Sequence, residues 1–213
     1  MQTYIFDFDG TLANSGKAGI MATQAAFKDF SLPEPSENII NYYMGIPIEV
    51  SFKEMVPEHE FEDEEFSQLL AKFREYYQKY EIDNLELFEG IMPTLEKLVE
   101  RGKSLFVVSS KHSTALLRNL AALDIANFFT GVIGSDQVKE YKPAPDGVLQ
   151  VLDHYKQKAN NAVMIGDAVF DLQMGKAAGV KTCGVSWGAH DVDSLISEHP
   201  DYLLNKPEEL LDI

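Results

Sequence analysis

Short apolar runs alternate with helical patterns along most of this 213-residue chain. The runs are rich in β-branched and aromatic residues, which is typical of buried strands. Between most of them lies a segment with helical spacing, such as residues 92–102, where Pro93 suits a first turn and Gly102 an end. This alternation predicts an α/β fold with a Rossmann-like, doubly wound parallel sheet. The predicted strands span residues 4–9, 104–110, 130–136, 162–167 and 182–187, with a weaker pattern at 201–205.

The interval from residue 15 to residue 84 breaks this alternation. It contains no convincing strand, but helical patterns cover residues 16–30, 36–45 and 62–80. In the last of these, apolar side chains recur at helical spacing while glutamates and lysines fill the other face, as expected for a helix in a small bundle. The chain is therefore predicted to have a Rossmann-like core of residues 1–14 and 85–213 and an inserted all-helical domain of residues 15–84.

Composition and charge limit the kind of protein. The net charge of −16 and the pI near 4.6 argue against binding to nucleic acid, whose phosphates would be repelled. No run approaches the roughly 20 apolar residues that a membrane span needs, and the first strand leaves no room for a signal peptide. The single cysteine, Cys183, cannot form an internal disulfide, which fits a reducing compartment. We therefore expect a cytoplasmic protein, with no nucleic-acid or membrane partner.

Two aspartates, Asp7 and Asp9, lie where the first predicted strand ends. In an extended chain they would point to the same side and repel each other, so a positive group is expected between them. A turn at Asp9-Gly10 is the alternative, because aspartate and glycine both favour turns. That alternative does not account for Asp7, a charged residue within an otherwise buried run. This stretch alone leaves a metal or phosphate site and a turn equally open.

Other predicted strands also end in oxygen-bearing side chains. Ser109 and Ser110 close one strand, Asp167 closes another, and Asp171 follows one helical turn later. A proline-containing loop between the third and fourth strands carries Lys142. Taken singly, these residues could be helix caps or a solvated lysine. Because ligands of open parallel sheets bind at the carboxyl ends of the strands, their joint occurrence favours a site that holds Mg²⁺ and transfers a phosphoryl group.

These residues resemble the four motifs of the haloacid dehalogenase superfamily, in its phosphatase branch. The stretch "DFDGTLANS" resembles the first motif, "VVSS" the second, "YKPAPD" the third and "GDAVFD" the fourth. They occur in the family's order, and the helical insert lies between the first two motifs, as the family's cap does. The resemblance implies a Mg²⁺-dependent phosphatase that hydrolyses a small phosphorylated metabolite, in a group similar to phosphoglycolate phosphatases.

The resemblance also implies roles for the site residues. Asp7 would attack phosphorus and form an aspartyl-phosphate, while Asp9 would protonate the leaving oxygen and later deprotonate water. The remaining assignments concern binding: Mg²⁺ would be held by Asp7, the backbone carbonyl of Asp9, Asp167 and Asp171, and the phosphoryl oxygens by Ser109, Lys142 and the backbone N–H of Ser110.

Two departures from the family pattern and several alternatives remain. Relatives often have Thr-Asn where this chain has Ser109-Ser110, so the side-chain amide of that motif is absent, and Asn14 stands where many have aspartate. A hexose-phosphate mutase, a pyrophosphatase or a 5′-nucleotidase of the same superfamily would share the motifs. A dehalogenase would lack the metal and the acid at Asp9, and a non-hydrolytic phosphoacceptor would have neither a helical cap nor that acid. A binding module would not need every catalytic position to be filled. The physiological substrate and the oligomeric state stay open.

Overall fold

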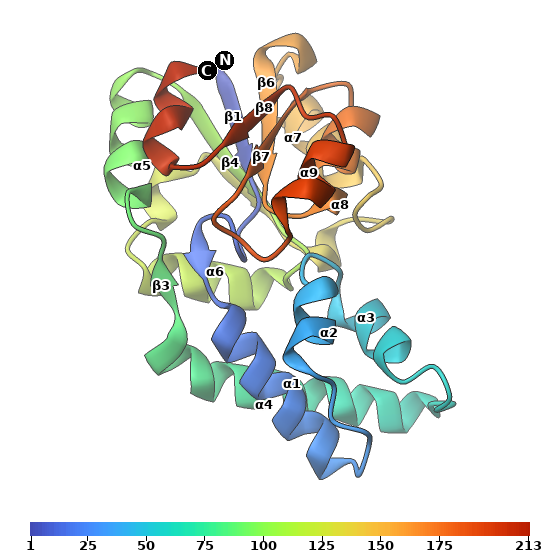
Figure 1. Cartoon of the computed structure of the whole chain (residues 1–213). Coiled ribbons are helices and arrows are strands. Elements are labelled where there is room, and N and C mark those ends of the chain that lie inside the picture. Colours follow the sequence, from blue (N-terminus) through green and yellow to red (C-terminus); the bar gives the residue numbers. More distant parts are fainter.

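All six predicted strands pair in a single parallel sheet in the computed structural model, which describes residues 1–213 (Figure 1). The strand order is β5-β4-β1-β6-β7-β8, so the chain winds outward from β1 in both directions and the expected doubly wound α/β fold is confirmed. The bounds of these strands are Thr3–Phe6 (β1), Ser104–Val108 (β4), Gly131–Ile133 (β5), Ala162–Gly166 (β6), Lys181–Val185 (β7) and Tyr202–Leu204 (β8).

Helices cover both faces of the sheet, because every buried strand has apolar side chains on both sides. In β1, Tyr4 and Phe6 join one apolar cluster and Ile5 joins the other. The first cluster includes α5 and α6, and the second includes α7 and α8. The helices that follow the inserted segment are α5 (Ile91–Glu100), α6 (Ser113–Ala122), α7 (Asp146–His154), α8 (Val169–Ala177) and α9 (Val192–Ser197).

The helices of residues 16–84 gather beneath the carboxyl ends of the strands in Figure 1. They enclose an apolar cluster of their own, in which Phe27 and Phe52 pack against Leu69 and Leu70. None of the helices in the molecule is both long enough and apolar enough to span a membrane. The four helices are α1 (Gly16–Asp29), α2 (Glu37–Tyr42), α3 (Ile48–Met55) and α4 (Asp63–Asn84).

Helix α3 was not expected from the sequence. The apolar residues Ile46, Ile48, Val50 and Phe52 fall at every second position, a spacing typical of strands rather than of helices. The helix has only eight residues and buries mainly Phe52, so its sequence is too short to show apolar residues at helical spacing. Packing of Phe52 against Phe27 and Phe73, with ring centroids 5.1 Å apart in both pairs, stabilises the segment as a helix.

Two short strands that the sequence did not indicate join the parts of the chain. Strand β2 (Ala13–Asn14) and strand β3 (Glu86–Leu87) pair antiparallel, so the connections into and out of the helical segment run side by side. Strands of two residues have no periodicity that a sequence pattern could show. The division into a core and a cap domain with these boundaries stays a prediction.

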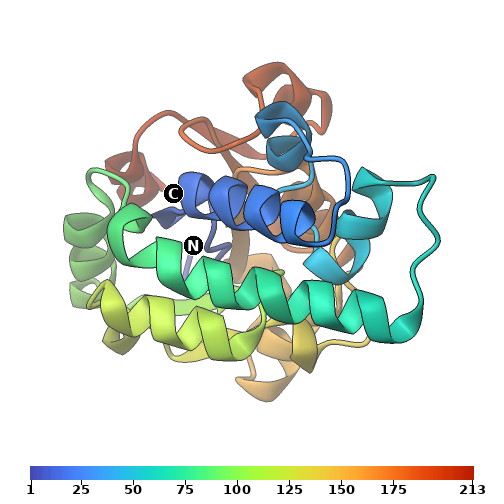
Figure 2. The ribbon, with the colours of Figure 1, turned by 90° about the horizontal axis from the view of Figure 1, so that it is seen from below.

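Helix α4 lies between α1 and α6, as the view from below shows (Figure 2). Its contact with α6 is polar: the buried carboxylate of Glu81 accepts hydrogen bonds from Arg118, at 2.6 and 3.1 Å, and from Asn119, at 2.7 Å. A buried carboxylate with three donors is well satisfied. This contact joins the helical segment to the helix that follows the Ser109-Ser110 loop.

Candidate active site

Three carboxylates from distant parts of the chain meet at the carboxyl end of the sheet. Asp7 follows β1, Asp167 follows β6, and Asp171 lies in the first turn of α8. Oxygen atoms of all three lie within 4.8 Å of one another, and each residue is at most 2% exposed. Strand β1 is hydrogen-bonded to β6 in the sheet, which explains how residues 160 positions apart reach the same point.

Lys142 balances part of this negative charge. Its Nζ atom donates to Asp7 Oδ1 at 2.5 Å and to Asp171 Oδ1 at 2.6 Å, and its side chain is almost completely buried. Burial alone would lower the pKa of Lys142, but the two carboxylates outweigh it, so its pKa lies above the ordinary value. The ammonium group therefore remains charged between the two aspartates.

Burial also changes the acidity of the aspartates. Burial, followed by the neighbouring Asp171, raises the pKa of Asp167 to about 7. The pKa of Asp7 is raised as well, mainly by burial, although Lys142 opposes this effect. Both shifts mean that the ionised forms of these carboxylates are disfavoured, first by burial and then by the neighbouring carboxylates.

The loop after β1 is shaped by close contact with Asp167. Gly10 has a φ of +84°, and a Cβ atom there would lie 2.2 Å from Asp167 Oδ2, so only glycine fits. Thr11 Oγ1 donates to Asp167 Oδ1 at 3.0 Å, and the backbone N–H of Ala189 donates to Oδ2 at 2.7 Å. These contacts hold the Asp167 carboxylate in one orientation toward the cluster.

Asp9 lies apart from the three-carboxylate cluster and has partners of its own. Strand β1 ends at Phe6, earlier than expected, and the Phe8 carbonyl accepts backbone N–H groups from Leu12 and Ala13. Asp9 therefore belongs to a tight loop, where its Oδ1 accepts from Ser15 Oγ at 2.5 Å and from Lys111 Nζ at 2.7 Å. The stretch thus contains both a turn, formed by residues 8–13, and a charged group, Lys111, that pairs with Asp9.

Lys111 is a site residue that the sequence reasoning missed. Its Nζ atom donates to Asp9, to the hydroxyl of Tyr77 at 2.7 Å and to Asn119 Oδ1 at 2.9 Å. Burial would lower its pKa, but Asp9 and Tyr77 outweigh burial and raise it. The available signal was its position directly after Ser109-Ser110 at a strand end. Thr11 was missed too, because a threonine in a turn has many ordinary explanations.

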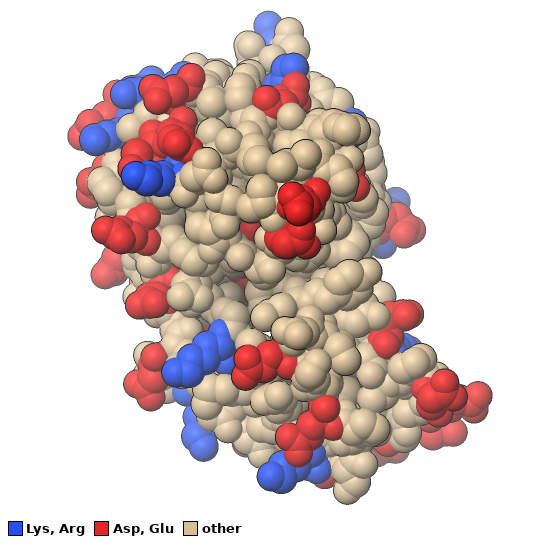
Figure 3. All heavy atoms as spheres, in the orientation of Figure 1, with Lys and Arg blue, Asp and Glu red and all other residues tan.

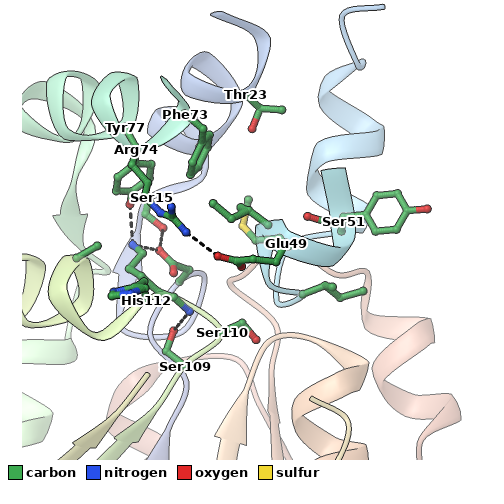
Figure 4. Close-up of a pocket in the computed structure, with 18 of the residues that line it drawn as sticks. Ser15, Thr23, Glu49, Ser51, Phe73, Arg74, Tyr77, Ser109, Ser110 and His112 are labelled. Atoms are coloured by element: carbon green, nitrogen blue, oxygen red, sulfur yellow. Dashed lines mark hydrogen bonds and ion pairs between the residues drawn. The ribbon is translucent and has the colours of Figure 1, made fainter. Parts of the chain in front are cut away.

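Ser109 and Ser110 lie at the end of β4, where the sequence placed them. The buried Ser109 hydroxyl accepts from the backbone N–H of Lys111 at 3.2 Å. Ser110 Oγ donates to the Gly45 carbonyl at 2.6 Å, which ties the loop after β4 to the loop between α2 and α3. Both serines line a cavity of about 490 Å³, together with Asp7 and Asp9 (Figure 4).

The donor set fits a hard divalent cation. The cluster offers only carboxylate oxygens, without histidine or cysteine, and Mg²⁺ prefers such ligands. Burial raises the pKa of both Asp7 and Asp167, which disfavours their ionised forms in the absence of a further positive charge. A divalent ion would supply that charge.

Comparisons with known proteins find relatives that match almost the whole chain. The chain is 33% identical to the pyrophosphatase PpaX of Listeria monocytogenes serotype 4b, over 99% of this chain and 95% of that protein. It is 30% identical to the phosphoglycolate phosphatase of Aquifex aeolicus, over 100% of this chain and 96% of that protein.

A solved structure shares the whole fold. The crystal structure of a predicted phosphoglycolate phosphatase from Haemophilus somnus superposes with a TM-score of 0.92 at 25% identity, covering 100% of this chain and 97% of that one. Residues 4–185 match the family described as haloacid dehalogenase-like hydrolase. The resemblance noted in the motifs is thereby confirmed, and the chain belongs to the haloacid dehalogenase-like hydrolase family.

Proposed function

We propose that this protein is a Mg²⁺-dependent phosphatase that hydrolyses a small phosphorylated metabolite through an aspartyl-phosphate. The observation that carries the proposal is the convergence of Asp7, Asp167 and Asp171 within 4.8 Å, beside Lys142. A carboxylate nucleophile, a carboxylate cluster for a hard cation and a buried ammonium group are the parts that phosphoryl transfer requires.

In the first step, a carboxylate oxygen of Asp7 attacks phosphorus while the bond to the leaving oxygen breaks. Asp9 gives a proton to that oxygen, so the alcohol leaves neutral. In the second step Asp9 takes a proton from water, whose oxygen attacks the aspartyl-phosphate, and phosphate and free Asp7 are released. The hydrogen bonds from Ser15 and Lys111 support this role, because they hold the Asp9 carboxylate in one position at the cavity.

The phosphoryl oxygens are bound by the Ser109 hydroxyl, the backbone N–H of Ser110 and Lys142. Ser109 and Ser110 line the same cavity as Asp7, which supports the first two contacts. Lys142 donates a hydrogen bond directly to Asp7. Its positive charge therefore acts at the atom that receives the phosphoryl group.

Mg²⁺ would be held by Asp7, Asp167 and the backbone carbonyl of Asp9, with Asp171 beside them. When bound, it neutralises charge on the phosphoryl oxygens and reduces their repulsion from the nucleophile. Asp171 also accepts the hydrogen bond from Lys142, so it links the lysine to the carboxylate cluster.

Residues 15–84 act as a cap over this site. Tyr77 on α4 contacts Lys111, and the Gly45 carbonyl contacts Ser110, so two parts of the helical segment lie directly on the strand ends. The paired connections β2 and β3 are the only strands between the two parts and are suited to act as hinges. Closure of a cap would exclude bulk water during the reaction.

A pyrophosphatase is the second candidate, because the relatives at 33% identity carry that name. Phosphoglycolate is a candidate substrate on the same grounds, from the relative in Aquifex aeolicus. Both reactions would use the same nucleophile, acid and cation site. They differ only in the group that leaves.

Hydrolysis of p-nitrophenyl phosphate tests the proposal. The purified protein is expected to release p-nitrophenol with Mg²⁺ present and to lose this activity in excess chelator. Asp7→Asn is the matched control, because it keeps the shape of the side chain but removes the nucleophile, so it is expected to lose the activity. Metal-independent release, or release by Asp7→Asn at the wild-type rate, would exclude the proposed chemistry.

Mg²⁺ binding is expected to tighten as the pH rises from about 5.5 to about 8. The pKa of Asp167 is about 7 in the folded metal-free protein and 3.8 in an ordinary aspartate. At pH values between these two, the protein therefore takes up a proton at Asp167 when it folds. The stability of the metal-free protein therefore falls as pH rises through this range. Because Mg²⁺ binds the ionised form, its stabilising effect should be larger at the higher pH.

Thermal denaturation with and without Mg²⁺ at the two pH values measures this effect. Asp167→Asn should weaken both the shift in melting temperature and its pH dependence. An equal shift at both pH values in the wild type would show that Asp167 is not part of the cation site.

A further inference from the structure

The cavity that contains Asp7 and Asp9 has an apolar wall on the side of the helical segment. Its volume is about 490 Å³, within the range of roughly 300–1,000 Å³ typical of sites that enclose drug-sized ligands. Ten of its 27 lining residues are hydrophobic, and nearly all of these come from residues 40–77, among them Met44, Ile46, Ile48, Met55 and Phe73. A phosphoryl group alone would leave this wall without a contact.

The wall lies directly beside the phosphoryl end of the cavity. Ser110 Oγ donates to the carbonyl of Gly45, and Gly45 is flanked in sequence by the lining residues Met44 and Ile46. Helix α3 begins at Ile48, two residues further on. In Figure 4, Ser109 and Ser110 lie at the lower end of the cavity, below the residues of α3 and α4. A group leaving from a phosphoryl bound at Asp7 therefore meets the segment from Met44 to Ile48.

The positive side chains of the cavity are already paired within the chain. Arg74 donates to Glu49 at 2.6 Å, Lys111 to Asp9 at 2.7 Å and Arg118 to Glu81 at 2.6 Å. The Lys111–Asp9 pair is the more shielded, with side chains 10% and 21% exposed, whereas the side chains of Arg74 and Glu49 are 46% and 29% exposed. Diverting Lys111 or Arg118 to a ligand would take a charged partner from Asp9 or Glu81, which is costly. A second anionic group on the substrate would thus compete with an existing carboxylate for each of these cations.

The net charge of the molecule also disfavours a second anionic group, because acidic side chains outnumber basic ones, 34 to 18. Acidic side chains are spread over both the sheet-containing part and the helical segment on the face shown in Figure 3. A substrate with two separate anionic groups is repelled more strongly by such a protein than a simple monoester is.

We propose that this enzyme is selective for phosphate monoesters whose leaving alcohol carries an apolar group about the size of a benzene ring, rather than for pyrophosphate or phosphoglycolate. The inference rests on the proposed phosphatase function and specifies its substrate class. The apolar group packs against Met44, Ile46 and Ile48 while the phosphoryl group meets Asp7, and burial of the ring removes apolar surface from water.

Benzyl phosphate and ethyl phosphate provide the test, because both release a primary alcohol but only the first carries a ring. With Mg²⁺ present, kcat/KM for benzyl phosphate is expected to exceed the values for ethyl phosphate, pyrophosphate and phosphoglycolate by about tenfold or more, the scale of hydrophobic-pocket discrimination. Thermal stabilisation by benzylphosphonate over ethylphosphonate should follow the same order without turnover.

A matched pair of variants on one helix locates the effect. Ile48→Thr should lower the benzyl-to-ethyl ratio about fivefold or more, on the scale of lost apolar contacts in pockets. Val50→Thr makes the same kind of change at an exposed position that does not line the cavity, and should leave the ratio unchanged.

The outcomes distinguish failure of the substrate selectivity from failure of the phosphatase function. If ethyl phosphate is hydrolysed but benzyl phosphate is no better, or if pyrophosphate or phosphoglycolate is preferred, the selectivity is refuted while the phosphatase function stands. If p-nitrophenyl phosphate is hydrolysed but none of the four compounds is, the selectivity alone is refuted. If p-nitrophenyl phosphate is not hydrolysed either, the phosphatase function fails and the selectivity fails with it.

Discussion

Replacement of Asp9 by asparagine is expected to lower kcat about 10²–10⁴-fold, the usual contribution of general acid–base catalysis. The amide keeps the size of the side chain and can still face Ser15 and Lys111, but it cannot donate a proton to a leaving alkoxide or remove one from water. Substrate binding should change little, because Ser109, Ser110 and Lys142 are untouched. The expected result is a loss in kcat with KM within a few-fold of the wild type.

Steady-state kinetics with an alkyl phosphate measures this effect most sharply, because an alkoxide needs protonation more than p-nitrophenolate does. The variant should therefore lose less activity toward p-nitrophenyl phosphate than toward ethyl phosphate. Asp83→Asn, on the exposed side of α4, is the control for an Asp-to-Asn change outside the site. Equal losses for both esters would contradict the role of Asp9 as proton donor, and wild-type rates would remove Asp9 from the mechanism.

The sequence predicted the parts of this protein that depend on burial and strand order. Each of the six strands is a short apolar run, and parallel strands place their carboxyl ends at one edge, so the meeting of Asp7 with Asp167 followed from the pattern. In the structure, the carboxylate oxygens lie within 4.8 Å of one another, which agrees with that reasoning. Their catalytic and metal-binding roles remain predictions, since geometry alone does not test them.

Features that depend on three-dimensional partners were not predictable. Lys111 looks like an ordinary surface lysine until α4 places Tyr77 against it and the loop after β1 places Asp9 there. The positive charge expected between Asp7 and Asp9 is supplied in the protein by two lysines, Lys142 on Asp7 and Lys111 on Asp9. Helix α3 was hidden because its alternating apolar residues follow a strand period, and tertiary packing of Phe52 overrides that local pattern.

Replacement of Lys142 by methionine is expected to lower the free energy of unfolding by about 3–5 kcal/mol at pH 8 without metal, the usual cost of removing one partner from a buried ion pair. Methionine fills much of the same volume, so the main loss is charge. Asp7 and Asp171 would then face each other and Asp167 with no positive neighbour, in a site that is almost closed to water. Denaturant unfolding gives the free energy directly.

The dependence of this loss on pH and on a second substitution identifies its cause. Because Asp7 and Asp167 already have raised pKa values, acid should protonate the cluster and reduce the difference between Lys142→Met and the wild type as the pH falls from 8 to about 5. Adding Asp171→Asn to the variant should recover part of the stability, since one of the unpaired charges is removed. Lys139→Met, at an exposed position in the same loop, should cost at most about 0.5 kcal/mol. If Lys142→Met were as stable as Lys139→Met at pH 8, the carboxylate cluster would not need the lysine, and the electrostatic account of the site would be wrong.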